Sequence, residues 1–212
     1  MIKDATSTAL DEGGDDTVDT GDGANIVVGG FGGDTLTGGA DSDLVVGDNG
    51  TAEFTTAGVV TLIESTDIDD STGGADIIVV NDGANQVIGG AGMDEITGGA
   101  GTDYVLGDHG SMTFTEAGVL TQMVSSLESL GTGDVITLGD GLNVAVAGQG
   151  ADDLTGGADE DIIFGDSGVV NFYDDGVIKD ATSTALDEGG DDTVDTGDGA
   201  NIVVGGFGGD TL

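Results

Sequence analysis

Oxygen-bearing side chains recur along this chain at intervals of nine residues, and an apolar residue follows each of them by two positions. Asp16, Asn25 and Asp34 begin the series, and Val18 and Leu36 are the apolar residues that accompany the two aspartates. The chain carries 42 acidic residues against two basic ones, a single histidine and no cysteine. This donor set favours a hard divalent cation held by oxygen atoms over zinc or copper. The complete series is Asp16, Asn25, Asp34, Asp43, Asp76, Asn85, Asp94, Asp103, Asp134, Asn143, Asp152, Asp161, Asp192, Asn201 and Asp210.

The nine-residue interval also predicts the elements that position these side chains. In the stretch 29–37, glycines permit backbone conformations with positive φ, so the turn can direct its carbonyl oxygens inward. Asp34 ends the turn, and in the short strand that follows Leu36 points inward while Thr35 and Thr37 point outward. Two nonapeptides complete one coil, so every second turn stacks on the same edge. The chain is therefore predicted to be an all-β parallel β-solenoid, or β-roll.

The stacked turns predict where a metal would bind. A cation between two turns could take carbonyl oxygens from both and a carboxylate from each, which gives the six to eight oxygen ligands that calcium takes. Without the cation, two carboxylates would face each other at close range and destabilise the coil. On one edge the predicted pairs are Asp16 with Asp34, Asp76 with Asp94, Asp134 with Asp152, and Asp192 with Asp210. On the other edge, where asparagine lowers the charge and binding should be weaker, they are Asn25 with Asp43, Asn85 with Asp103, and Asn143 with Asp161.

A longer repeat is built from the nonapeptides. The stretch 13–50 recurs without gaps twice, at offsets of 60 and then a further 58 residues, and a fourth copy begins at Gly189. Ile2–Leu36 is identical to Ile178–Leu212, which indicates tandem duplication of a unit of 176 residues. We therefore expect the chain to be a segment of a longer array. The predicted blocks of this one continuous repeat domain are 1–72, 73–130, 131–188 and 189–212.

The end of each block departs from the pattern. The fifth rung, residues 47–55 in block one, keeps its glycines but has Ala52 where the acid would stand. A second turn at Ala57-Gly58 leads into an apolar segment at 59–63. This sixth segment could be one more solenoid strand, or it could pair with the fifth rung as a protruding hairpin. We favour the solenoid strand because stacking then continues without a break, which gives about nine coils and roughly 40 Å for each unit of 176 residues.

The second and fourth rungs of each block are apolar on both faces. A strand of that kind is normally covered on both faces, and an exposed apolar stripe seldom stays bare on a soluble monomer. The stripe could pack against a second copy of the solenoid and give a paired filament, or the sixth segments could fold back over it. The sequence leaves both possibilities open. The outward residues of the stripe are Ile26, Val28, Leu44, Val46, Tyr104, Leu106, Val144, Val146, Ile162 and Phe164.

The composition argues against several classes of function. Nucleic acids and anionic membranes are recognised through lysine and arginine patches, whereas this chain has a formal net charge of -40. It has no run of 18 apolar residues that could span a membrane, and residues 1–4 lack the apolar stretch of a signal peptide. With His109 as the sole histidine and no cysteine, no Ser/His/Asp or Cys/His set can be assembled, so we do not expect an enzyme.

These repeats resemble the RTX family, the calcium-binding nonapeptide proteins that bacteria export by type I secretion. The resemblance implies a right-handed parallel β-roll that is disordered at low calcium and folds around several Ca²⁺ ions outside the cell. The chain departs from the family pattern in the asparagine of each second rung, the missing acid of each fifth rung, and the segment 65–72. The turns that match best are Gly29-Gly30-Phe31-Gly32-Gly33-Asp34, Gly89-Gly90-Ala91-Gly92-Met93-Asp94 and Gly98-Gly99-Ala100-Gly101-Thr102-Asp103.

Three functions agree with these features. The first is a calcium-stabilised structural segment of a secreted or cell-surface bacterial protein such as an adhesin, acting as a rigid extender or fibre-forming module. The second is a solenoid that binds ice or carbohydrate, for which Thr35 and Thr37 offer a polar ladder that Glu95 and Asp153 interrupt. The third is a calcium-triggered folding segment that aids type I secretion. We expect the first, because identical tandem copies suit a part that sets length.

Overall fold

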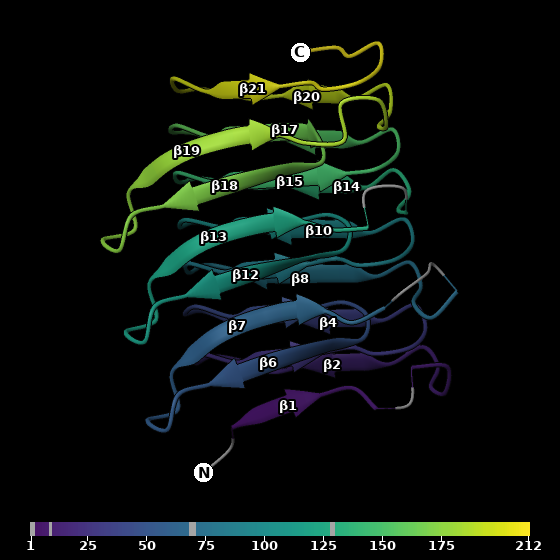
Figure 1. Ribbon diagram of the computed structural model, residues 1–212, viewed down its shortest axis with the longest axis vertical. Coiled ribbons are helices and arrows are strands. Elements are labelled where there is room, and N and C mark those ends of the chain that lie inside the picture. Colours follow the sequence, from purple (N-terminus) through teal and green to yellow (C-terminus); the bar gives the residue numbers. More distant parts are fainter. Residues whose placement is uncertain (1–2, 9, 68–70, 128–129) are drawn as a thin grey trace.

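The computed structural model describes residues 3–8, 10–67, 71–127 and 130–212. All regular secondary structure in these residues is β-strand, and the strands form three sheets of seven strands each. Figure 1 shows the strands of each sheet stacked along one axis, with the N-terminus at one end and the C-terminus at the other. The predicted parallel β-roll is confirmed, and a third sheet is added to it.

Two of the three sheets are parallel and form the walls of the roll. In each coil, a short strand of one wall is followed by a turn and a short strand of the other. The first roll sheet contains β2 (Thr17–Asp19), β4 (Thr35–Thr37), β8 (Ile77–Asn81), β10 (Glu95–Gly98), β14 (Val135–Thr137), β16 (Asp153–Thr155) and β20 (Thr193–Asp195). The second roll sheet contains β3 (Ile26–Val28), β5 (Leu44–Val46), β9 (Gln86–Ile88), β11 (Tyr104–Leu106), β15 (Val144–Gly148), β17 (Ile162–Asp166) and β21 (Ile202–Val204).

Inward side chains of the two roll sheets fill the space between the walls. Leu36 of β4 pairs in register with Val18 of the preceding coil and Ile78 of the following one, and all three contribute to one core. Coils this tight need glycine in the turns, where φ reaches 110° at Gly30 and 116° at Gly32. The buried members of this core are Val27, Leu36, Val45, Ile78, Val80, Val87, Ile96, Val105, Ile136, Leu138, Ala145, Ala147, Leu154, Ile163 and Val194.

The third sheet, here called the hairpin sheet, is antiparallel and lies against the outside of the roll. Each of the first three blocks contributes a hairpin made of its fifth rung and its sixth segment, such as β6 paired with β7. The turn of that hairpin is closed by the amide of Gly58, which donates to the carbonyl of Thr55 at 2.9 Å. The strands of this sheet are β1 (Asp4–Thr6), β6 (Gly50–Phe54), β7 (Val60–Ser65), β12 (Gly110–Phe114), β13 (Leu120–Ser125), β18 (Gly168–Phe172) and β19 (Ile178–Ser183).

The prediction of a sixth solenoid strand is therefore wrong, and the fifth rung also lies outside the roll. The chain leaves the roll after Gly47 and returns near Gly74, and β8 of block two then pairs directly with β4 of block one. Each block thus adds two coils rather than three. A unit of 176 residues adds about six coils and rises by roughly 29 Å, at the usual spacing of about 4.8 Å between strands.

Of the two possibilities left open for the apolar stripe, the structure shows the second, because these hairpins fold over it. Val46 is 0% exposed and Phe164 2% exposed, and the ring of Tyr104 meets Phe172 of β18 edge to face at 5.6 Å between centroids. A tethered hairpin reaches the stripe at any protein concentration, whereas a second copy does not. Most of the stripe is therefore buried within the chain. The buried residues of this second core are Leu44, Val46, Ala52, Ile63, Ile88, Leu106, Met112, Leu120, Met123, Val144, Val146, Phe164, Val170 and Phe172.

Not every predicted residue of the stripe is buried. Ile26, in the coil nearest the N-terminal end, remains 43% exposed. Val28, Tyr104 and Ile162 are partly buried and pack against the second core. The hairpins thus cover the centre of the stripe most completely.

Candidate calcium sites

A continuous ladder of aspartates runs along the edge where turns lead into the first roll sheet. In each coil, Oδ1 of one aspartate accepts a hydrogen bond from the backbone amide of the aspartate in the preceding coil. The distance is 2.7 Å from Asp16 N to Asp34 Oδ1 and 2.7 Å from Asp34 N to Asp76 Oδ1. The same bond joins Asp76 to Asp94, Asp94 to Asp134, Asp134 to Asp152, Asp152 to Asp192, and Asp192 to Asp210.

The ladder brings together all four aspartate pairs that the sequence predicted for this edge. It also stacks Asp34 on Asp76 across the first hairpin, a contact between blocks that the sequence analysis did not foresee. The reason is that the hairpin leaves the roll entirely, so the next block resumes directly on the last coil. Eight aspartates therefore form one series rather than four separate pairs.

The second carboxylate oxygen of most ladder aspartates has no hydrogen-bond partner. Burial of a carboxylate oxygen without a partner carries a large desolvation cost, so such an atom calls for a ligand. Asp16 is exposed in its end coil, and Asp210, in the last coil, is partly buried. The aspartates whose Oδ2 is buried and unpaired are Asp34, Asp76, Asp94, Asp134, Asp152 and Asp192.

The electrostatics of the ladder also call for a cation. Burial is the largest cause that raises the pKa of Asp76 to about 7 and that of Asp152 to about 9. It also raises the pKa of Asp94 well above its usual range, and the charges of Asp134 and Asp76 add to the effect. These carboxyl groups resist ionisation at neutral pH unless a positive charge lies beside them.

Main-chain oxygens of the adjacent coil converge on the same space as the unpaired carboxylate oxygens. A methyl group added at Gly29 would lie 2.4 Å from Oδ2 of Asp34 and 2.0 Å from the carbonyl oxygen of Gly47. At Gly89 it would lie 2.4 Å from Oδ2 of Asp94 and 2.1 Å from the carbonyl oxygen of the next coil. Glycine is required at both positions by space, since neither has positive φ.

This donor set fits calcium. Carboxylate and carbonyl oxygens are the ligands that calcium takes, and the chain has no cysteine to attract a softer metal. Within the described ranges, no group of three or more Asp, Glu, His or Cys side chains is arranged to hold a metal by itself. Binding by aspartates of neighbouring coils together with main-chain carbonyls stays our prediction for these sites.

One position of this edge differs from its equivalents. Gly29 and Gly89 correspond in the third block to Ala147, which places a methyl group in the turn that leads to Asp152. The carbonyl oxygen of Ala147 is still available to the preceding coil, where a methyl group added at Gly107 would lie 2.4 Å from it. The space beside Asp152 is therefore the least open of the series.

The other edge of the roll carries an alternating ladder of asparagine and aspartate. Asn25 N lies 2.9 Å from Asp43 Oδ1, and Asp43 N lies 2.8 Å from Asn85 Oδ1. The series continues from Asn85 to Asp103, Asp103 to Asn143, Asn143 to Asp161, and Asp161 to Asn201. The predicted pairs of the second edge are thus also brought together.

The asparagine side chains of the second edge donate hydrogen bonds to carbonyl groups of their own turns and to neighbouring aspartates. Nδ2 of Asn143 donates to the carbonyl of Gly139 at 3.2 Å, to the carbonyl of Gly141 at 3.1 Å and to Oδ1 of Asp161 at 3.0 Å. The NH₂ group thus supplies the positive partner that a cation would supply. Among the described residues of this ladder, only Asp103 has a buried Oδ2 without a partner. Weaker calcium binding at this edge stays a prediction.

A third set of buried carboxylates was missed by the sequence analysis. Asp48, Asp108 and Asp166 each follow the first glycine of a fifth rung and are at most 3% exposed. Burial, and then the charge of Asp76, raises the pKa of Asp48 to about 8. The recurrence of a Gly-Asp pair at these three positions was the available signal. It was overlooked because the fifth rung was judged by its acid position, which holds Ala52 in block one.

Comparison with protein families matches this geometry. A profile of the RTX calcium-binding nonapeptide repeat, in four copies, matches residues 8–36, 19–51, 70–108, 137–169 and 184–212. These stretches cover more than half of the chain. The chain belongs to the RTX calcium-binding nonapeptide repeat family. Comparisons with curated proteins and with solved structures yield no match.

Membership of the RTX repeat family identifies calcium as the ion of these repeats and the roll as a structural calcium-binding repeat. The matched ranges include all the predicted ligand residues of both edges except Asp134, which lies between two of them. In the part of the chain that the structure describes, no helix has the length and apolar character needed to cross a membrane. The assignment of individual aspartates as ligands remains our prediction.

Proposed function

We propose that this RTX roll is a calcium-stabilised structural segment of a secreted or cell-surface bacterial protein, in which it acts as a rigid extender. The observation that carries the proposal is the unbroken aspartate ladder, in which Asp34, Asp76 and Asp94 stack in succession without a compensating base. Calcium between the coils converts this repulsion into attraction along the whole length of the roll. Each coil of a repeat domain contacts only its neighbours. Ions bound between successive coils therefore stiffen the roll along its whole length.

The tandem identity of residues 2–36 and 178–212 supports a role in setting length. Residues 178–212 repeat the sequence of the first coil, and β20 of that coil pairs in register with β16 of the coil before it, so one unit can follow another without a break. Each added unit extends the roll by about six coils, or roughly 29 Å. A fibre held together through the apolar stripe is not part of this proposal, because the hairpin sheet covers that surface.

The proposal is tested by titrating the calcium-free chain with calcium while far-UV circular dichroism is recorded. We expect a transition from coil to β-structure at roughly 10⁻⁴–10⁻³ M calcium, the range of extracellular calcium modules. Small-angle scattering of the chain and of a version lengthened by one unit of 176 residues should then show an increase in length of about 29 Å. If a chelator leaves the β-structure and the melting temperature unchanged, calcium does not stabilise the roll.

A second candidate function rests on the outer face of the first roll sheet, which no other described sheet covers. One column of outward residues there is free of charge over five consecutive coils and could present a regular surface to ice or carbohydrate. Its residues, in register, are Thr37, Val79, Thr97, Thr137 and Thr155. The neighbouring column contains Glu95 and Asp153, as the sequence indicated. Thr137→Glu should abolish inhibition of ice recrystallisation if this face binds ice, and a wild-type chain without such inhibition excludes ice.

A further inference from the structure

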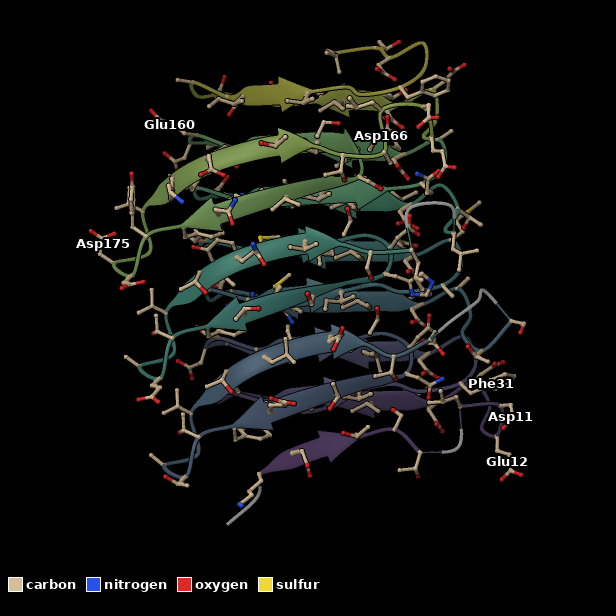
Figure 2. The ribbon with its side chains drawn as sticks, viewed as in Figure 1. Asp11, Glu12, Phe31, Glu160, Asp166 and Asp175 are labelled. Atoms are coloured by element: carbon tan, nitrogen blue, oxygen red, sulfur yellow. The ribbon has the colours of Figure 1, made fainter. Side chains whose placement is uncertain are left out.

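The three buried aspartates that follow Gly47, Gly107 and Gly165 lie where the chain leaves the roll for a hairpin. Figure 2 shows Asp166 at this edge of the roll, on the same side as Phe31, while Glu160 lies at the opposite edge and Asp175 at a hairpin tip.

The junction carboxylates of the first and third hairpins are each bound to two segments of the roll that are distant in sequence. Oδ1 of Asp48 accepts a hydrogen bond from the amide of Gly74 at 2.9 Å, and its Oδ2 accepts one from the amide of Ala91. Asp166 has the same arrangement, with the amide of Gly190 at 3.0 Å and that of Phe207. The carboxylate therefore joins the returning chain to the turn of the next coil.

Glycines at the surrounding positions leave room for these carboxylates. A methyl group added at Gly73 would lie 2.2 Å from Oδ2 of Asp48, and one added at Gly90 would lie 2.5 Å from the same atom. The equivalent glycines around Asp108 are Gly131 and Gly148, where the contacts with Oδ2 would be 2.1 and 2.3 Å. The site is thus built in the same way at successive junctions, which is not expected of an incidental turn residue.

At the second junction, Asp108 combines nearly complete burial with an oxygen that lacks a normal hydrogen bond. Its side chain is 3% exposed and its Oδ2 accepts from the amide of Gln149. Its Oδ1 has no hydrogen bond of normal distance and angle, although the backbone amide of Thr132 lies close enough to stabilise the charged carboxylate. It lies within electrostatic reach of Asp134, whose Oδ2 is also buried and unpaired. The two lysines of the whole chain cannot neutralise three such junctions together with the ladder.

A main-chain oxygen converges on the same place. A methyl group added at Gly107, the residue before Asp108, would lie 2.4 Å from Oδ2 of Asp134 and 2.4 Å from the carbonyl oxygen of Ala147. At the first junction, a methyl group added at Gly47 would lie 2.1 Å from Oδ2 of Asp76, with a carbonyl oxygen of the next coil at 2.5 Å. At these two junctions a ladder carboxylate and a carbonyl oxygen thus converge beside the glycine that precedes the junction aspartate.

We propose that Asp48, Asp108 and Asp166 are additional ligands for a divalent cation, which they share with the ladder aspartates Asp76, Asp134 and Asp192. The three junction residues lie outside the acid position of the nonapeptide. The cation would be bound by oxygen atoms alone, which is the chemistry of calcium. Because each junction aspartate comes just before the first strand of a hairpin, the ion also fixes the root of that hairpin to the roll. The inference rests on the proposed calcium dependence of the roll.

The test compares Asp108→Asn with Asp174→Asn in the full chain of 212 residues. Both variants remove one negative charge, but Asp174 is exposed at the tip of the third hairpin. The amide that replaces the Asp108 carboxylate would keep a side-chain oxygen for the Gln149 amide, so a purely structural hydrogen bond would survive. The number of calcium ions bound per chain is measured by equilibrium dialysis over a range of calcium concentrations. Terbium luminescence lifetimes in H₂O and D₂O then count the water molecules on the bound ions.

The expected result for Asp108→Asn is the loss of one bound ion per chain, or an affinity about tenfold or more lower for one ion, because a charged ligand is removed. Asp174→Asn should bind like the wild type. Unchanged stoichiometry, affinity and water count in Asp108→Asn would overturn the junction site while leaving the calcium-stabilised roll intact. A wild-type chain that binds no calcium would instead overturn the proposed function.

A second variant keeps the test decisive if Asp108→Asn does not fold. Asp166→Asn changes the equivalent residue at the third junction, nearer the end of the roll, where fewer coils depend on it. Its loss of one ion supports the proposal, and full retention of ions and affinity overturns it.

Discussion

The backbone amide of Asp94 donates a hydrogen bond of 2.9 Å to Oδ1 of Asp134, although 40 residues and a complete hairpin separate the two in sequence. The bond has the same form as the one between Asp76 and Asp94, which are only 18 residues apart. The roll therefore continues through each hairpin without a change in its edge. As a consequence, the charge of the ladder is distributed over the whole stack, and its stability should respond to pH and calcium as one unit.

The first prediction concerns pH in the absence of calcium. The pKa values of Asp76, Asp48 and Asp152 are raised by burial from 3.8 to about 7, 8 and 9. Between 3.8 and these values the folded chain binds more protons than the unfolded chain, so its stability falls as pH rises. The contribution is fully present below pH 3.8 and is lost as pH passes through about 7 to 9. In chelator, the content of β-structure measured by circular dichroism should therefore be higher at about pH 5 than at about pH 9.

With saturating calcium the dependence on pH should reverse. Calcium needs ionised carboxylates, so binding releases protons and strengthens as pH rises through the same range. The melting temperature of the calcium-loaded chain should accordingly be higher at about pH 8 than at about pH 5. If stability changes with pH in the same direction with and without calcium, the buried aspartates are not the calcium ligands.

The second prediction concerns the glycine beside Asp94. Gly89→Ala adds a methyl group close to Oδ2 of Asp94 and the carbonyl oxygen of Gly107, without any backbone strain from positive φ. We expect the calcium affinity of that site to fall by about tenfold or more, because the methyl group displaces oxygen ligands. Calorimetric titration measures the change. Gly14→Ala is the matched control, since a methyl group at Gly14 has no atom within 4 Å.

The third block has alanine, Ala147, at the position equivalent to Gly89. Ala147→Gly should open the space beside Asp152 and strengthen binding there, so the two substitutions should shift calcium affinity in opposite directions. Equal effects of Gly89→Ala and Gly14→Ala would mean that the space above Gly89 is not a cation site.

The roll itself could be predicted from the sequence because its determinants are local. The interval between Asp16 and Asp34 fixes the length of one coil, and the inward positions of Val18 and Leu36 follow from strand alternation. The course of the sixth segment could not be decided in this way. An alternating strand such as 50–54 satisfies a solenoid rung and a hairpin equally well, and the choice depends on contacts between distant coils.

The same limit explains which site residues were found. Asp34 and Asp76 were recognised from their spacing. Their contact with each other could not be predicted, because the sequence does not show that the hairpin lies outside the roll. Asp48 lies in a Gly-Asp-Asn-Gly stretch that is typical of an ordinary turn. Its burial arises only because the chain leaves the roll at that point, which no local pattern reveals.

The third prediction concerns the docking of the hairpin sheet. Ile63 of β7 is 0% exposed and belongs to the core between this sheet and the second roll sheet. Ile63→Ala should lower the free energy of unfolding by about 2–5 kcal/mol, the usual cost of such a truncation in a packed core. Urea denaturation in saturating calcium measures it. Glu64→Ala, the neighbouring exposed position on the same strand, should change stability little. Similar effects of the two substitutions would indicate that the hairpin is not packed on the roll.

The fourth prediction concerns the asparagines of the second edge. Asn143→Asp removes the Nδ2 donor to Gly139, Gly141 and Asp161 and places a second carboxylate beside Asp161. Without calcium the variant should be less stable than the wild type, because two carboxylates then face each other with the turn carbonyls unpaired. With calcium it should recover and bind at least one ion more than the wild type, since the donor set now matches that of the first edge.

Asp103→Asn provides the reciprocal change on the same edge. The oxygen of the introduced side-chain amide would still accept from the backbone amide of Asn85, while its NH₂ group would remove the buried unpaired oxygen. We therefore expect this variant to have more β-structure in chelator than the wild type and to gain less on addition of calcium, as measured by circular dichroism. If both substitutions change the content of β-structure in the calcium-free chain in the same direction, the asparagine amide does not replace a cation in these turns.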